Sequence, residues 1–121
     1  MAKIRHIAYR VDDAEAMARF LIEGFDMTIA QRRGAGVIDL TDGTINVSLL
    51  PLNRAGSTAV RGIEHIGFTA SDNDAAKRKV MAAGAKEKNT IQLGPVHYEM
   101  KFEGPEGMIV DVGEWAGTEP V

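Results

Sequence analysis

The sequence contains no cysteine, and this absence excludes several kinds of chemistry. The chain can form no disulfide, no thiolate metal site and no cysteine nucleophile. No apolar run approaches the roughly 20 residues that a membrane-spanning helix needs. The first residues also lack the apolar stretch of a signal peptide. From these absences we expect a cytoplasmic protein that does not interact with membranes.

The chain also has fewer basic than acidic side chains. The chain has 14 lysine and arginine residues against 17 aspartate and glutamate residues, which gives a net charge of −3. Nucleic-acid binding depends on a basic face that contacts phosphates, and the sequence shows none. We therefore expect no nucleic-acid partner. The length of 121 residues is that of one domain with one core, so we predict a single domain over residues 1–121.

What the sequence does contain is an internal repeat. The segment 4–9 (Ile-Arg-His-Ile-Ala-Tyr) recurs half a chain length later as 63–68 (Ile-Glu-His-Ile-Gly-Phe). The repeat places His6 on His65, two of only three histidines in the chain. Two copies of one unit should be pseudo-symmetric, so their corresponding residues should meet near the pseudo-axis. A pair of histidines brought together in this way suggests a metal site.

Hydrophobic periodicity and turn residues predict the same order of elements in both copies. The first module, about residues 3–50, should form a strand over 3–11, a helix from Asp12-Asp13 to Gly24, and strands at about 26–32, 36–41 and 44–50. The second, about 62–115, should form a strand over 62–70, a helix over 73–83, and strands at about 86–92, 96–103 and 107–115. Residues 51–61 should form the linker. The predicted fold class is α+β, with two tandem βαβββ modules.

This organisation resembles the vicinal oxygen chelate superfamily of glyoxalase I, extradiol dioxygenases, methylmalonyl-CoA epimerase and the fosfomycin and bleomycin resistance proteins. The residues that carry the resemblance are the paired strand openings with His6 and His65, and the closing turn 104–111 (Gly-Pro-Glu-Gly-Met-Ile-Val-Asp). The resemblance implies two half-barrels that face each other over a cleft. It covers roughly residues 3–115 and does not fix the reaction, because this scaffold supports many chemistries.

The resemblance also implies that His6 and His65 are metal ligands. Strand alternation supports this, because it places each histidine on the face opposite the more apolar, helix-facing side. The superfamily's last ligand stands four residues after the turn glycine, which here is Asp111. A carboxylate between two valines would also be costly in a buried strand without a cation nearby. Glu114 is the fallback ligand, although it has the opposite parity.

The first module should hold a fourth ligand at the corresponding place, but counting from Gly43 gives Val47, which cannot bind a metal. By this count Asn46 and Ser48, the residues on either side of Val47, point to the opposite face of the strand. The missing ligand disfavours glyoxalase and epimerase activity and favours an extradiol-dioxygenase-like or lyase-type enzyme that binds one Fe, Mn or Zn ion. A metal-free, ligand-sequestering protein of the bleomycin-resistance type is the alternative.

One strand offers further candidates for the cleft. His97, Glu99 and Lys101 share its polar face, with His97 as a candidate acid or base and Lys101 as an anion partner. A solvated strand edge is the other interpretation of this face. In the first module we expect Arg10 and Val47 to contact a small-molecule substrate. Exposed sheet edges further favour a homodimer.

Overall fold

The computed structural model describes residues 2–52, 60–93 and 97–113, without the side chains of residues 90–98. These residues divide into two compact units, one of residues 6–64 and one of residues 65–113 with the first few residues of the chain. The predicted single domain stays a prediction. No helix in the described part of the chain is long and apolar enough to cross a membrane.

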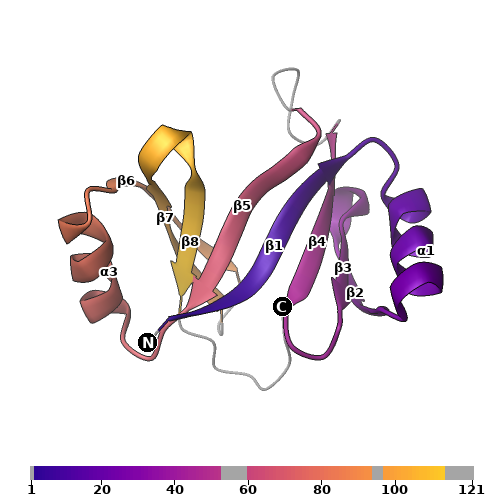
Figure 1. Cartoon of the computed structure of the whole chain (residues 1–121), viewed down its shortest axis with the longest axis horizontal. Helices are drawn as coiled ribbons and strands as arrows, with labels where there is room; N and C mark the ends of the chain where they lie inside the picture. The colour runs from indigo at the N-terminus through magenta and orange to yellow at the C-terminus, as the bar shows by residue number, and fades with distance from the viewer. Residues whose placement is uncertain (1, 53–59, 94–96, 114–121) are drawn as a thin grey trace. The chain divides into compact units, whose positions relative to one another are not determined.

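Over residues 3–51 the N-terminal module contains one α-helix and four strands (Figure 1). They are β1 (Lys3–Val11), α1 (Ala14–Phe25), β2 (Thr28–Arg32), β3 (Ile38–Thr41) and β4 (Asn46–Pro51). The strands follow the order β2-β3-β4-β1, with β4 parallel to β1 and the other neighbours antiparallel. A 3-10 turn over Gly34–Gly36 joins β2 to β3.

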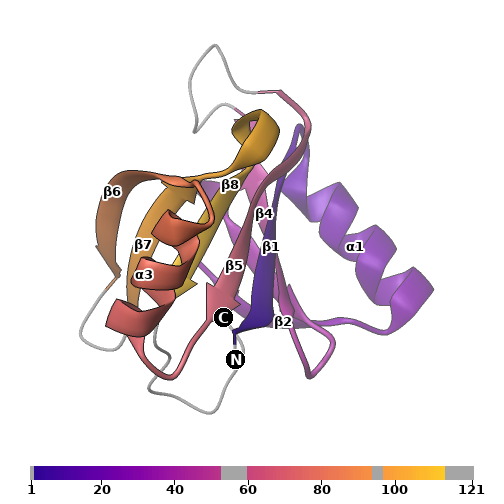
Figure 2. The ribbon, with the colours of Figure 1, turned by 60° about the vertical axis from the view of Figure 1, so that its left-hand side comes forward.

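The C-terminal module has the same plan. Its elements are β5 (Gly62–Thr69), α3 (Asn73–Ala82), β6 (Lys86–Leu93), β7 (His97–Glu103) and β8 (Ile109–Gly113). The strand order is β5-β8-β7-β6, and β8 is parallel to β5. Figure 2 shows α3 lying beside β7 and β8. The prediction of two βαβββ modules is confirmed, and the eight strands belong to one mixed sheet.

The helices α1 and α3 begin in the same way and end differently. Asp13 and Asp72 are the N-caps, and each carboxylate accepts a hydrogen bond of 3.0 Å from a backbone N–H three residues on. The prediction that Gly24 ends the first helix is wrong, because α1 continues to Phe25. Asp26 ends it instead, in the left-handed conformation with φ of 57°. A short polar side chain tolerates that conformation better than most residues do.

Each module packs its helix against one face of its own strands. In the N-terminal module the buried core residues are Val11, Ala14, Ala18, Met27, Ile38, Leu40 and Leu49, with Val47 packed against them. In the C-terminal module the core is smaller, with Met100, Phe102 and Val112 buried. The helix α3 contributes no fully buried residue to it.

The position of Val47 corrects the predicted parity of β4. In the parallel pairing of β1 with β4, His6 lies opposite Asn46 and Ala8 lies opposite Ser48. Residues in register share a face, so Asn46 and Ser48 lie on the face of His6, while Val47 lies on the helix side. The predicted place of Val47 beside His6 is therefore wrong. A slip of one residue moves every side chain of a strand to the other face.

Candidate metal centre

The carboxylate of Asp111 lies at the middle of a polar cluster in the C-terminal module. Its side chain is 1% exposed, and His65 Nε2 lies 3.1 Å from Asp111 Oδ2. Lys101 Nζ lies 2.9 Å from Oδ1 and 3.2 Å from Oδ2 of the same carboxylate. Three adjacent strands position these groups, with His65 on β5, Asp111 on β8 and Lys101 on β7.

The pair of Lys101 and Asp111 explains how a carboxylate can be buried in this strand. Val110 and Val112 flank Asp111 in the sequence and belong to the core on the other face. A buried carboxylate is costly unless charged or polar groups compensate it, and the ammonium group of Lys101 does so. This pair was not predicted from the sequence. A sequence signal for the pair exists, because Lys101 and Asp111 have opposite charges and flank the turn 104–108. The two residues are in register on neighbouring strands, where opposite charges stabilise each other.

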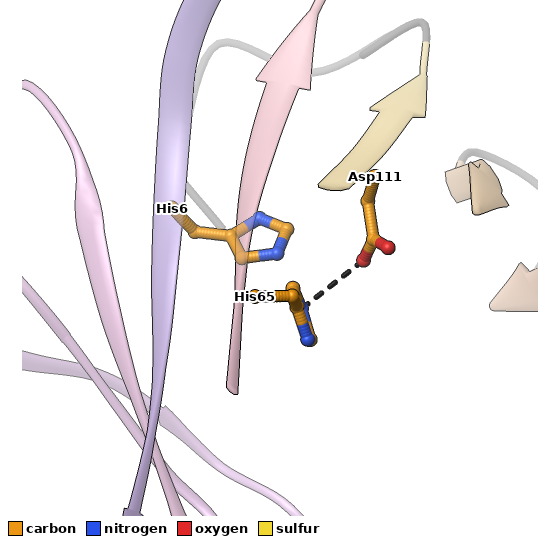
Figure 3. A group of neighbouring side chains, drawn as sticks. All are labelled: His6, His65 and Asp111. Carbon is orange, nitrogen blue, oxygen red and sulfur yellow. Dashed lines mark ion pairs between the residues drawn. The ribbon is translucent and has the colours of Figure 1, made fainter. Parts of the chain in front are cut away.

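His6 adds a second imidazole to this group. It lies on β1 and is 7% exposed. Each of the three residues His6, His65 and Asp111 offers one potential ligand atom, and these three atoms lie within 4.8 Å of one another. Figure 3 shows the three side chains as neighbours, with the ion pair of His65 and Asp111 dashed. Two imidazoles and a carboxylate, without sulfur, suit Fe, Mn or Zn as a divalent ion. The donor set therefore fits the predicted metal.

The other predicted site residues have varied surroundings. Arg10 Nη2 lies 3.1 Å from Glu64 Oε1, so a carboxylate of the same chain already pairs with this guanidinium. Glu99 is buried on β7, two residues before Lys101. The side chain of His97 and all of Glu114 lie outside the described residues. The role of His97 as an acid or base stays a prediction.

A second buried carboxylate, not predicted from the sequence, lies in the N-terminal module. Asp39 on β3 is 0% exposed. Arg33 Nε donates to Asp39 Oδ2 over 2.7 Å and Arg33 Nη2 donates to Oδ1 over 3.0 Å. Gln31 Nε2 adds a hydrogen bond of 2.8 Å. Asp39 thus accepts three hydrogen bonds from neighbouring side chains, and it does not belong to the cluster of His6, His65 and Asp111.

The comparison with protein families decides the assignment. The family model described as "Glyoxalase/Bleomycin resistance protein/Dioxygenase superfamily" matches residues 3–112. The chain belongs to this superfamily. The predicted resemblance is thus confirmed over almost the whole chain. A search of curated protein sequences finds no significant match.

Solved structures support the same fold. A hypothetical protein from Bacillus halodurans is 14% identical with a TM-score of 0.77, and the match covers 99% of each chain. Methylmalonyl-CoA epimerase from Mycobacterium tuberculosis is 16% identical with a TM-score of 0.74, over 94% of this chain and 88% of that one. The 2,3-dioxygenase LapB from a Pseudomonas species is 15% identical with a TM-score of 0.73, over 93% and 40%. At these identities the likeness shows the fold alone.

Proposed function

We propose that this chain is a divalent-metal-dependent enzyme that acts on a small organic substrate with two adjacent oxygens. His6, His65 and Asp111 are the proposed ligands. The observation that carries the proposal is the convergence of two repeated histidines on one buried carboxylate. When bound, the ion would supply Lewis-acid chemistry to the substrate oxygens.

The strand pairing supports a set of three protein ligands. Asp111 lies opposite Gly67 in the pairing of β5 with β8, and Ser48 lies opposite Ala8 in the pairing of β1 with β4. Since Gly67 is the repeat counterpart of Ala8, Ser48 is the counterpart of Asp111. A neutral serine is a poor ligand where a carboxylate or imidazole would be expected. Three protein ligands leave coordination positions for a chelating substrate, as an extradiol-dioxygenase-like or lyase-type reaction would need.

The chain's own groups define part of the proposed substrate site. Glu99 and Lys101 lie at successive positions on one face of β7, and the ammonium group of Lys101 forms an ion pair with Asp111. Arg10 lies four residues beyond His6 on the same face of β1, with its guanidinium held by Glu64. We propose that these charged groups orient the polar end of the substrate. The expected homodimer stays a prediction.

The ion pair of Lys101 with Asp111 favours a second candidate function. A lysine ammonium already supplies a positive charge to the carboxylate, at 2.9 Å. The same cluster could therefore be stable without any metal. In that case the chain would be a metal-free protein that binds and sequesters its ligand, as bleomycin-resistance proteins do.

A ligand screen with and without a chelator separates these two functions. Catechols, 2-oxoaldehydes and thiol adducts would be offered to protein loaded with Fe(II), Mn(II) or Zn(II), and to the same protein after chelator treatment. The enzyme proposal predicts turnover of at least one compound, lost on chelation and restored by metal. Ligand binding that is unchanged by the chelator, without turnover, would instead support sequestration.

A further inference from the structure

Asn46 is the first residue of β4 and has an unusual environment. Its side chain is 0% exposed. Neither Oδ1 nor Nδ2 of its amide has a hydrogen-bond partner among the described residues. Buried polar groups in native proteins nearly always have a partner, so an unpaired amide calls for a physical reason. A side chain that packs close to Asn46 on the same face of the sheet can supply this partner.

Two residues lie directly beside Asn46 in the sheet. On β3 its register partner is Thr41, whose hydroxyl donates to the carbonyl oxygen of Ile45 over 3.3 Å and so has no proton left for Asn46 Oδ1. On β1 its register partner is His6. Paired residues on neighbouring strands present their side chains to the same face, only about 5 Å apart at Cβ. The imidazole of His6 is therefore the polar group best placed to form a hydrogen bond with the side-chain amide of Asn46.

We infer that Asn46 is a positioning residue for His6 in the metal-loaded protein, an inference that rests on the proposed function. Metal-bound histidines almost always donate the N–H of their second ring nitrogen to an oxygen acceptor, which fixes the tautomer and the orientation of the ring. Asn46 Oδ1 is that acceptor. A bound metal would fix the imidazole of His6 so that its second ring N–H is directed to this oxygen and the hydrogen bond forms.

The variant Asn46→Leu tests this inference through two readouts that move in opposite directions. Leucine has a similar size and no polar side-chain group, so it removes the free-energy cost of burying an amide that has no hydrogen bond in the metal-free protein. The melting temperature of metal-free Asn46→Leu should therefore equal or exceed that of the wild type. The affinity for Mn(II) or Zn(II), measured by calorimetric titration of chelator-treated protein, should fall about 10- to 100-fold.

The variant Asn46→Asp supplies the matched control, because it keeps the acceptor oxygen. Its metal affinity should lie within about threefold of the wild type or exceed it, even though a buried carboxylate lowers the melting temperature of the metal-free form. Unchanged metal affinity in Asn46→Leu would overturn the inference, and so would an equal loss of affinity in both variants. A lowered melting temperature of metal-free Asn46→Leu would show a merely structural role and overturn it too. If the wild type itself binds no metal, the proposed function and this inference fail together.

Discussion

Asp111→Asn should lower the affinity of the protein for a divalent ion by at least about 100-fold. Of the three proposed ligands, Asp111 is the one that carries negative charge, and an amide of the same shape is a much weaker ligand for Fe, Mn or Zn. The variant also leaves the ammonium group of Lys101 without its carboxylate, so we expect the free energy of unfolding to fall by about 3–5 kcal/mol. Metal titration monitored by calorimetry, with circular dichroism to confirm folding, measures both effects.

Asp39→Asn is the control for this variant. Asp39 is also buried and ion-paired, with Arg33 as its cationic partner. Its removal should cost stability in a similar way, but metal affinity should stay within a few-fold of the wild type. If Asp39→Asn and Asp111→Asn reduce metal affinity equally, the loss reflects general destabilisation and Asp111 is not a ligand.

Lys101→Met should change metal affinity in the opposite direction. In the metal-free protein the ammonium group of Lys101 contacts both carboxylate oxygens of Asp111, so an incoming ion must compete with it. Removing that charge should raise metal affinity by about tenfold or more, because like charges repel strongly in a partly buried site. The same variant should unfold more easily without metal, since it leaves a buried carboxylate unpaired. Added metal should reverse this destabilisation.

An exposed lysine provides the comparison. Lys77 pairs with Glu87 over 3.0 Å, and both side chains are about 40% exposed. Exposed ion pairs contribute little, so Lys77→Met should change the free energy of unfolding by less than about 1 kcal/mol and leave metal affinity unchanged. Weaker metal binding by Lys101→Met than by the wild type would mean that Lys101 supports the site and does not compete with the ion.

The fold could be predicted because local signals and the internal repeat agree. The segment 3–11 alternates as a strand, and Asp13 and Asp72 cap helices in the same place in both modules. The details that failed depend on one residue of difference. Two residues separate Gly43 from the start of β4 at Asn46, whereas one residue separates Gly107 from the start of β8 at Ile109. Counting from the turn glycine therefore worked for Asp111 but placed Val47 on the wrong face.

Only some residues of the candidate site could be predicted from the sequence. Repetition identified His6 and His65, because a duplicated histidine at matching positions is a strong signal within one chain. The ion pair of Lys101 with Asp111 and the burial of Asn46 depend on strand register. Register follows from turn geometry and the packing of whole faces, and single-residue patterns do not determine it.

The most direct test of the proposed metal centre is a calorimetric titration of chelator-treated protein with Mn(II), Zn(II) and, without oxygen, Fe(II). For at least one of these ions we expect about one site per chain. The double variant His6→Ala, His65→Ala should show no measurable binding, because one carboxylate alone holds a divalent ion poorly. Absence of binding by the wild type, or binding that the double variant retains, would contradict the account.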